Sequence, residues 1–311
     1  MKSFLGILIA LFIVSATSAQ SWNQYPYEPD GTDLTFPADE GHHPGEPVEW
    51  WYTVGHVTGD VTGTEYSYML TYFYYPTLGI DGFRIFNLAN DATGDFFEQT
   101  LAANYNILSQ EHLEIEAAVI LGGTEVWETV RDTAGDLIPF TYHIEAEQTN
   151  GSINLDYSAL KRPLVLDGTG FFYQGAESYT YYYSQTMLAV EGSMTIDGYS
   201  EPVTGTAWID RQWGNFNPST GEQYEWFCVQ LDNGMDMNIW QIFDTEDQIP
   251  DTSTYRLVSI YVDDSTDVHS HEFEYHREAY SYLPDSSMVY SQQWHFVYDD
   301  IDLMITTLHN N

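Results

Sequence analysis

The sequence predicts an all-β protein made of two antiparallel barrels or sandwiches. Short segments rich in Tyr, Val, Ile, Thr and Trp recur along the chain, and turns containing Gly, Asp and Asn separate them. This pattern is typical of β-strands, and helical periodicity is scarce. A dozen or more short strands without crossover helices form a barrel or a sandwich, and this number of strands indicates two such units.

The expected strands begin at residue 48 and continue to near the C-terminus. Residues 48–54 and 66–75 form the first pair, with a turn at residues 60–63 between them. The later strands are expected at residues 112–121, 140–146, 179–190, 205–210, 225–231, 235–242, 255–262 and 293–297. The dipeptide at residues 233–234, Asn-Gly, suits a two-residue hairpin, in which both central positions need a positive φ. Residues 100–110 are expected to form a short helix.

Residues 1–19 have the features of a signal peptide. Lys2 is followed by an apolar run over residues 4–14 and by small residues at 15–19, which suit cleavage after Ala19. The run is too short for a stable membrane span, and no later segment approaches the ~20 apolar residues that a span needs. An uncleaved anchor is the alternative interpretation. The mature chain is therefore expected in the periplasm or outside the cell, without a membrane span.

The rest of the chain is long enough for two domains. Residues 194–198 combine the end of one strand with an Asp-Gly turn, and a second group of strands follows. We therefore expect an N-terminal β domain over residues 20–195 and a C-terminal β domain over residues 196–311. Cys228 is the only cysteine, so no disulfide can form within the chain.

The chain is strongly acidic. It has 8 Lys+Arg against 47 Asp+Glu, which gives a net charge of −39 at pH 7. Such a surface repels nucleic-acid phosphates and anionic lipid headgroups, so nucleic acid is not expected as a partner. The acids are spread among the expected strands, and this distribution indicates a bacterium of a saline habitat. There, salt screens the repulsion between the acids with a screening length of about 10 Å or less.

The first group of candidate residues lies at residues 49–52, which read Glu-Trp-Trp-Tyr. On a strand, Trp50 and Tyr52 share one face, and Glu49 and Trp51 share the other. Inside a barrel walled by Trp51, burial would raise the pKa of Glu49 and let it donate a proton near neutral pH. The alternative, which the residues alone favour, is that Glu49 faces water or pairs with a buried arginine.

The second group surrounds Asp210. Alternation sends Trp208 and Asp210 to one face of the expected strand, and Ile209 and Arg211 to the other. In one interpretation Arg211 forms a buried ion pair that joins two sheets, for example with Glu49. In the other, Asp210 is an acid, and Arg211 orients it or holds an anion. The spacing does not decide between the two.

Weaker candidates are histidines, acidic turns and a tyrosine cluster. The histidines of residues 269–276 could hold a metal, but surface histidines explain them more simply. Residues 91–95 and 263–267 lack the full pattern of a calcium loop and are simpler as solvated turns, so no metal is expected. Residues 181–184, Tyr-Tyr-Tyr-Ser, either line a pocket or fill a core. No phosphate loop or Gly-x-Ser-x-Gly elbow is present, so no cofactor is expected and a common serine hydrolase is disfavoured.

The two groups resemble the motifs of the AttH/carotenoid 1,2-hydratase (hydroxyneurosporene synthase) family. The family opens with Phe-Pro-x-Asp-x-Gly-x-His-Pro and then Glu-Trp-Trp-Tyr, which match residues 36–44 and 49–52. Its second signature, Gly-x-Ala-Trp-hydrophobic-Asp-x-x-Trp-Gly, matches residues 205–214. Further similar stretches lie at residues 163–168, 181–184 and 226–234.

The resemblance implies two lipocalin-like β domains packed together, with an apolar pocket in or between them. Characterised relatives act on terpenoid or polyketide-like molecules, adding water to an alkene or guiding a cyclisation, so the implied partner is an apolar isoprenoid- or lipid-like molecule. By this resemblance Glu49 and Asp210 are candidate acids, with Arg211 beside them. An acid would protonate a C=C bond, and aromatic faces would hold the carbocation. The candidate binding residues are His43, Trp50, Trp51, Tyr52, Tyr183, Trp208 and Trp213.

Three features depart from the family pattern. Gln212 stands where many relatives carry Glu. Asn238 and Trp240 occupy the hairpin in which the hydratase branch is expected to have a later acid. The sequence ends at Asn311, before the Trp-Glu-Gly and Tyr-x-Glu segment with which relatives close. We therefore expect the second domain to lack its last strands, so that either a sheet edge stays open because the reading frame is truncated, or another element covers that edge in a shorter variant of the fold.

Three functions remain open: a hydratase for isoprenoid-like alkenes, a lipocalin-like carrier without turnover, and a secreted hydrolase, a label that some relatives carry. An enzyme is slightly favoured over a pure carrier, because buried acids beside aromatic residues are costly merely to fill space. If both motifs form one active site, Glu49 and Asp210 must open into one apolar cavity.

Overall fold

The computed structural model describes residues 21–77, 79–174, 178–216, 223–244, 246, 248–250, 255–282 and 289–308. Within these ranges the protein is almost entirely β-structure, interrupted by two short 3₁₀ turns, η1 (Ala38–Glu40) and η2 (Leu166–Gly168). The predicted all-β fold class is confirmed. The predicted signal peptide, residues 1–19, lies outside the described residues. In the described ranges, none of the helices is long and apolar enough to cross a membrane.

Ten strands of the described chain form a closed antiparallel barrel. They are β1 (Val48–Gly59), β2 (Glu65–Thr77), β3 (Ile80–Asn90), β4 (Asp95–Leu108), β5 (Glu114–Val119), β6 (Thr124–Arg131), β7 (Leu137–Gln148), β8 (Gly151–Ala159), β11 (Tyr179–Ile196) and β12 (Tyr199–Asn215). The second half of β11 pairs with β8 and closes the barrel. Its first half pairs with two short strands outside the closed part, β9 (Leu164–Val165) and β10 (Phe171–Tyr173).

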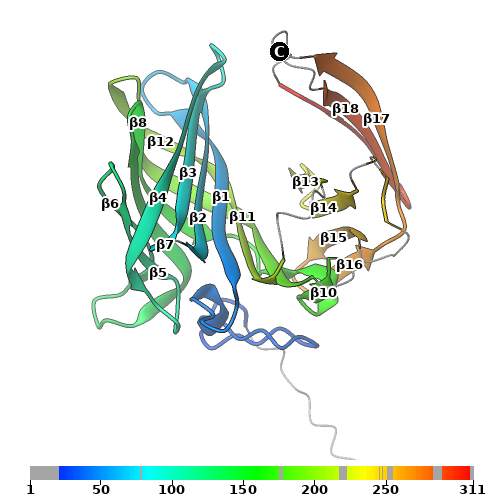
Figure 1. Cartoon of the computed structure of the whole chain (residues 1–311), viewed down its shortest axis with the longest axis horizontal. Coiled ribbons are helices and arrows are strands. Elements are labelled where there is room, and N and C mark those ends of the chain that lie inside the picture. Colours follow the sequence, from blue (N-terminus) through cyan, green and yellow to red (C-terminus); the bar gives the residue numbers. More distant parts are fainter. Residues whose placement is uncertain are drawn as a thin grey trace, which may run out of the picture.

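Aromatic side chains fill the barrel. Every second residue of a strand points inward, and Trp51, Tyr72 and Trp127 are among the largest side chains buried there. Each such ring removes a large apolar area from water, so an aromatic fraction of 16% supplies a large core in a chain with one cysteine. The N-terminal segment lies across one end of the barrel (Figure 1) and adds Leu34 and Phe36 to this core.

The C-terminal part consists of two smaller antiparallel sheets (Figure 1). The four-stranded sheet contains β13 (Gln223–Gln230), β14 (Asp236–Phe243), β15 (Arg256–Asp263) and β16 (Thr266–Ser270). The three-stranded sheet contains β17 (Glu274–Tyr282), β18 (Val289–Tyr298) and β19 (Ile301–Thr306). The two sheets share a buried cluster that includes Met237, Ile260 and Phe296. In the described residues this second part is thus a pair of sheets beside the closed barrel.

The four-stranded sheet packs against the barrel near β9, β10 and β11. Leu166, Phe172 and Tyr182 from the barrel side share a second buried cluster with Trp240 and Leu257. Burial of apolar surface on this scale stabilises the association of the two parts. The face of the barrel next to this cluster is therefore covered by the second part.

Two ion pairs stand at the same junction. Arg162 Nη2 lies 2.8 Å from Asp267 Oδ1, and Lys161 Nζ lies 2.6 Å from Asp236 Oδ2. The chain has only 8 Lys+Arg, and two of them bind acids of the second part. These partly buried pairs help to fix how the four-stranded sheet is oriented on the barrel.

The boundary between the two parts lies later than predicted. β12 pairs along its length with β1 and β11, so residues 199–215 belong to the first barrel. Asp197 and Gly198, next to the predicted boundary at residue 195, form the turn of the β11–β12 hairpin, and both have positive φ. The change of sheet falls between Asn215 and Gln223.

The helix predicted at residues 100–110 is wrong. Most of this segment belongs to β4, which pairs with β3 on one side and β5 on the other. Leu101, Ala102 and Ala103 have high helix propensity, but propensity is a weak preference that ladder hydrogen bonds and barrel packing override. The wrong prediction arose because the segment contains little of the strand-type alternation seen elsewhere.

The β13–β14 hairpin is confirmed, but its loop is longer than predicted. Residues 232–234 form a three-residue loop, closed by the hydrogen bond from the Leu231 N–H to the Met235 carbonyl. In this loop only Gly234 has a positive φ, 89°. A three-residue hairpin loop needs one left-handed residue at its last position, and glycine takes that conformation without strain.

Candidate active site

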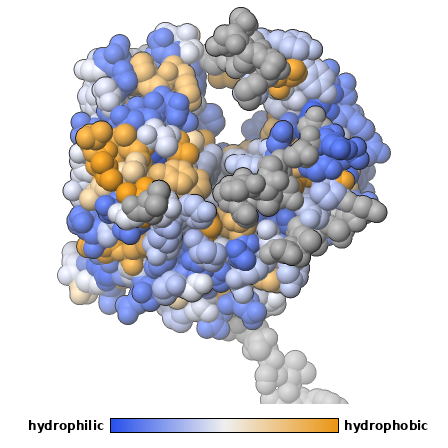
Figure 2. All heavy atoms as spheres, in the orientation of Figure 1, coloured by the Kyte–Doolittle hydropathy of each residue, from blue (hydrophilic) through white to orange (hydrophobic). Residues whose placement is uncertain are grey.

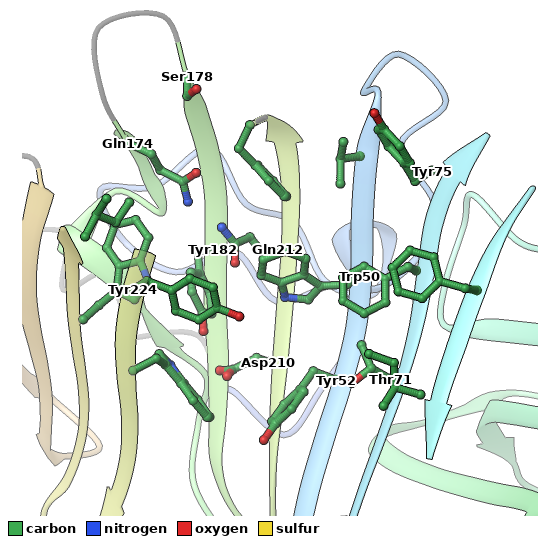
Figure 3. A pocket seen from close by; sticks show the side chains of 18 of the residues that line it. Trp50, Tyr52, Thr71, Tyr75, Gln174, Ser178, Tyr182, Asp210, Gln212 and Tyr224 are labelled. Carbon is green, nitrogen blue, oxygen red and sulfur yellow. The ribbon is translucent and has the colours of Figure 1, made fainter. Parts of the chain in front are cut away.

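A pocket of about 500 Å³ lies between the barrel and the second part of the chain. Its floor is the outer face of β1, β2, β3, β11 and β12, and its opposite wall comes from β13 and β14 (Figure 3). Figure 2 shows the molecule hollowed between its two parts, with hydrophobic residues on the barrel beside the hollow. The aromatic lining residues are Trp50, Tyr52, Phe73, Tyr75, Phe83, Tyr182, Phe216, Tyr224, Trp226 and Trp240.

The register of β11, β12 and β1 arranges polar side chains on the pocket floor in two rows. In the first, the Asp210 row, Asp210 lies between Ser184 on β11 and Tyr52 on β1. Each of these residues is directly opposite its neighbour in the ladder, where side chains on one face meet. Tyr52 in turn packs edge to face on Trp226 of β13, with ring centroids 5.3 Å apart. The acid therefore lies beneath an aromatic cover.

The second row lies two residues further along β12 and is formed by the same three strands. In this Gln212 row, Gln212 lies between Tyr182 on β11 and Trp50 on β1. Trp50 also contacts Phe73, its partner on β2, at a ring-centroid distance of 5.4 Å. Figure 3 shows both rows facing the same open space, with Asp210 below Gln212.

Asp210 is the one carboxylic acid among the described lining residues. Its Oδ1 accepts hydrogen bonds from Ser184 Oγ at 2.5 Å and from Trp208 Nε1 at 2.8 Å. Burial raises the pKa of Asp210 from 3.8 to about 7, although hydrogen bonds from Ser184, Trp208 and Tyr182 act to lower it. The carboxyl is therefore substantially protonated near neutral pH.

Asn238 of β14 ties this hydrogen-bond network to the second part of the chain. Its Nδ2 donates to Ser184 Oγ at 3.2 Å and to the Tyr182 hydroxyl at 3.4 Å. Both hydroxyls touch the Asp210 carboxyl. The acid is thus positioned by residues from both sides of the pocket, and Asn238, which departs from the family pattern, has a defined place in it.

Glu49 lies on the opposite face of the same strands, inside the barrel. It is fully buried, and Arg211 Nη2 and His42 Nδ1 lie 3.0 Å and 3.2 Å from its Oε2. Burial raises the pKa of Glu49, but the Arg211 charge and hydrogen bonds from His42 and His43 outweigh burial and lower the pKa to about 2. The expectation that Glu49 donates a proton near neutral pH is therefore wrong. The alternative, a buried ion pair with Arg211, is confirmed, although the pair joins neighbouring strands of one barrel rather than two sheets.

Arg211 connects the barrel to the N-terminal segment. Its guanidinium lies 3.9 Å from the ring centroid of Trp51 and 5.1 Å from that of Trp213. It also donates to the carbonyl oxygens of Glu40 and Gly41 in the segment that closes the barrel end. A fully buried cation with this many partners stabilises one arrangement of the chain, and its location inside the barrel keeps it out of the pocket.

A second buried acid with a raised pKa, Glu40, also lies inside the barrel. It accepts hydrogen bonds from the Tyr142 hydroxyl at 2.6 Å and from the Tyr25 hydroxyl at 2.9 Å. Burial raises the pKa of Glu40 from 4.5 to about 7, although the two hydroxyls act to lower it. Glu40 therefore resembles Asp210 in acidity but does not line the pocket.

The structure separates the predicted site residues into two groups. Asp210, Trp50 and Tyr52 line the pocket, and Trp208 lies on the same face behind Asp210. The others lie on the interior side of the barrel: Glu49, Arg211, His43, Trp51, Tyr183 and Trp213. Glu49 and Asp210 consequently do not open into one cavity. The two motifs are neighbours in the sheet, but successive residues of a strand point to opposite faces.

The candidate binding residues chosen from the sequence leave out Tyr182, Trp226 and Trp240, which the structure places in the pocket. For Tyr182 a signal was available, because alternation within the Tyr-Tyr-Tyr-Ser segment puts it on the same face as Ser184. For the tryptophans the signal was the predicted hairpin, in which Trp226 and Trp240 are directly opposite each other. Neither signal shows that the hairpin folds back over the barrel.

The histidines of the C-terminal part do not converge on a metal site. His269 Nδ1 lies 3.0 Å from Ser259 Oγ, and His271 Nε2 lies 3.1 Å from Asp167 Oδ1. His276 is largely exposed, with Glu274 its nearest acid at 3.8 Å. In the part of the chain that the structure describes, no three His, Cys, Asp or Glu side chains are grouped as metal ligands.

Fold and site together define a β-barrel protein with an aromatic pocket between the barrel and a second β part, and among the described residues that line this pocket Asp210 is the one carboxylic acid. A scan against family models matches residues 27–311 to the AttH-like family. The chain therefore belongs to the AttH-like family. This match covers both parts of the fold and both motif groups.

Solved structures of two proteins are similar over most of their length. One is an AttH protein from Nitrosomonas europaea, with a TM-score of 0.75 and 21% identity, covering 93% of this chain and 88% of that protein. Another is kievitone hydratase from Nectria haematococca, with a TM-score of 0.68 and 14% identity, covering 93% of this chain and 87% of that protein. At these identities the likeness shows a shared fold. A comparison with curated protein sequences found no significant match.

Proposed function

We propose that the protein binds an apolar isoprenoid- or lipid-like molecule in the pocket and adds water to one of its C=C bonds, with Asp210 as the acid. The observation that carries this proposal is the buried carboxyl of Asp210, whose pKa is raised to about 7, on the floor of an aromatic pocket. A general acid works best when its pKa lies near the working pH. An aromatic pocket in turn selects an apolar ligand.

The chemistry needs one acid and one water molecule. The O–H bond of the Asp210 carboxyl breaks as the π electrons of the alkene form a new C–H bond, which leaves a carbocation on the neighbouring carbon and a carboxylate on Asp210. Water then adds to the cation through its oxygen and returns a proton to the carboxylate. The sum is alkene plus water giving an alcohol, and the acid is regenerated. Because the same carboxyl gives and receives the proton, the absence of a second acid among the described lining residues is compatible with this reaction.

Aromatic rings surround the position where positive charge would develop. Tyr52 and Trp226 are in edge-to-face contact beside Asp210, and Trp50 lies in the next row. Ring faces attract cations, by about 2 kcal/mol where water is excluded. One structural neighbour is kievitone hydratase, which supports hydration as a chemistry that this fold can accommodate.

The experiment compares two isosteric changes, Asp210→Asn and Glu40→Gln. Both remove a buried acid with a pKa of about 7, but only Asp210 lines the pocket. With an acyclic carotenoid as the substrate, we expect Asp210→Asn to lower the hydration rate by about 100-fold or more and Glu40→Gln to leave most of it. Equal turnover in the native protein and the folded Asp210→Asn protein would refute the proposal.

A lipocalin-like carrier without turnover is the second candidate, favoured by the amide of Gln212 and by the finding that Asp210 is the one acid among the described lining residues. It predicts an apolar ligand that co-purifies with the protein, binding of an apolar fluorophore, and no alcohol product. A panel of esters and amides tests the hydrolase alternative in the same series.

We also propose that the protein acts after export, in the periplasm or outside the cell, in a saline habitat. The signal-like residues 1–19 and the net charge of −39 support this. Fractionation of the producing cells, with sequencing of the mature N-terminus, tests whether the chain begins after Ala19.

A further inference from the structure

Gln212 has a buried donor without a protein partner. The residue is 1% exposed, and its Nε2 makes no hydrogen bond with any described residue. Leaving such a donor unpaired costs about 1–3 kcal/mol, so buried amides are normally paired with protein, water or a ligand. Tyr182 and Trp50 flank Gln212 in its row, and the amide faces the open space of the pocket (Figure 3).

A second orphan donor comes from the opposite wall. Trp226 Nε1 is also buried without a hydrogen-bond partner in the described chain. The described lining residues include no Lys, Arg or His, and the chain as a whole carries a net charge of −39. The described lining of the pocket therefore offers uncharged donors and no cation to neutralise an anion. A neutral acceptor fits it, whereas a carboxylate or a phosphate would be desolvated without a counter-charge.

The two rows set the distance between this donor and the acid. Asp210 and Gln212 are two residues apart on one strand and share a face, so their Cα atoms are separated by about 7 Å at the usual rise per residue. We propose that the substrate carries a neutral acceptor oxygen, as an alcohol, carbonyl or ether, which Gln212 Nε2 binds about 7 Å from the C=C bond that Asp210 protonates. The acceptor site at Gln212 does not depend on the proposed hydration; only the position of the C=C bond beside Asp210 rests on it.

Such an arrangement fixes where water adds. A molecule whose oxygen is bound in the Gln212 row places beside Asp210 the double bond that lies about six bonds from this oxygen. An extended carbon chain of about six bonds spans the same distance of about 7 Å that separates the two rows. Double bonds next to the oxygen remain beside Gln212, out of reach of the acid. The expected product therefore has its new hydroxyl on the far end of the molecule from its first oxygen.

Four small molecules that share one carbon skeleton provide the test. Citronellol has an alcohol and one trisubstituted double bond at the required separation, and citronellal replaces the alcohol with a carbonyl that can only accept. The hydrocarbon 2,6-dimethyl-2-octene lacks oxygen, and citronellate carries a negative charge. Dissociation constants are measured by calorimetry or by quenching of pocket tryptophans, for the native protein and Gln212→Met, a change of similar size that removes the amide.

The decisive quantity is the ratio of the hydrocarbon dissociation constant to that of citronellol or citronellal. We expect Gln212→Met to lower this ratio by about 3- to 10-fold for both oxygenated ligands, the value of one neutral hydrogen bond. Citronellate is expected to bind the native protein more weakly than citronellal. A ratio that Gln212→Met leaves unchanged, or one that changes for citronellol alone, would overturn the inference. Gln212→Leu repeats the comparison if Gln212→Met does not fold.

The acceptor site and the hydration reaction are tested by separate measurements. The ratio needs no catalysis, so it can support or overturn the acceptor site even if no ligand is hydrated. If hydration occurs, citronellol is expected to give 3,7-dimethyloctane-1,7-diol, and Gln212→Met is expected to lower kcat/KM for citronellol but not for the hydrocarbon. Loss of hydration in Asp210→Asn with the binding ratio intact would support both assignments.

Discussion

Replacing Asp210 with Asn should stabilise the fold at alkaline pH, in addition to removing the acid. The native carboxyl is buried with a pKa of about 7, against 3.8 for the same group in water. Below about pH 4 the group is neutral in both the folded and the unfolded chain and has no effect on stability. Between these values the unfolded chain loses the proton first, so the native protein loses stability as the pH rises.

The size of the effect follows from that pKa difference. Each pH unit corresponds to about 1.4 kcal/mol, so the span from 3.8 to about 7 amounts to about 4 kcal/mol. About 3 kcal/mol of this falls between pH 5 and pH 8. An asparagine stays neutral throughout, and its Oδ1 can still accept from Ser184 and Trp208. The free energy of unfolding of Asp210→Asn, minus that of the native protein, should therefore rise by about 3 kcal/mol from pH 5 to pH 8.

The assay is urea unfolding at pH 5 and pH 8, followed by tryptophan fluorescence and far-UV circular dichroism, with coincident transitions as the check on two-state behaviour. Glu40 titrates in the same range because burial raises its pKa to about 7, but it is present in both proteins and cancels in the difference. Asp232→Asn, in the exposed loop of the β13–β14 hairpin, makes the same charge change at the surface and serves as the control. Effects of about 1 kcal/mol on the free energy of unfolding are measurable. If the difference in this free energy between Asp210→Asn and the native protein changes by less than about 0.5 kcal/mol from pH 5 to pH 8, Asp210 is not held neutral in the fold.

Three further outcomes are expected. Hydration by the native protein should be constant from pH 5 to about 6 and fall above pH 7, because burial raises the pKa of Asp210 to about 7 and only its protonated form is the acid; a kcat/KM profile that rises above pH 7 would contradict this. Arg211→Met should lower the free energy of unfolding by about 3–5 kcal/mol, because it leaves Glu49 buried without its cation; a change below about 1 kcal/mol, the typical effect of a single mutation, would show that the pair is replaceable. Gly214→Ala should disturb the β11–β12 ladder at the pocket edge, because φ is 151° and the new Cβ would meet the Tyr179 carbonyl oxygen; unchanged thermal unfolding would refute that strain.

Much of the fold and part of the site follow from local patterns. The alternation within residues 49–52 puts Trp50 and Tyr52 on one face of their strand, and the alternation within residues 208–211 separates Asp210 from Arg211; the structure shows both divisions. The pairing of β1 with β12 decides which faces of the two strands coincide, and it brings Glu49 and Arg211 to the same side, where the ion pair forms. The inferences from alternation succeed because the pleat of a strand is a local property of the backbone.

Other features depend on partners that are distant in sequence. The segment at residues 100–110 becomes a strand because two neighbours supply its hydrogen bonds. Residues 199–215 belong to the first barrel because they pair with β1, about 150 residues earlier in the chain, rather than with the strands that follow them. Composition and periodicity near these residues hold no information about which strands they will meet.

Local patterns in the sequence predict an all-β chain, the residues of each strand that share a face, and Glu49 and Asp210 as the candidate acids. Which of these two acids can donate a proton depends on their surroundings in the folded protein. Glu49 and Asp210 are both buried beside tryptophans, but Glu49 meets a guanidinium inside the barrel and stays ionised, whereas Asp210 meets hydroxyls and an indole under β13 and β14 and is held near neutrality. The pKa of a buried carboxyl depends on the charges and donors within a few ångströms, and in this fold those groups come from strands that long-range pairing brings together.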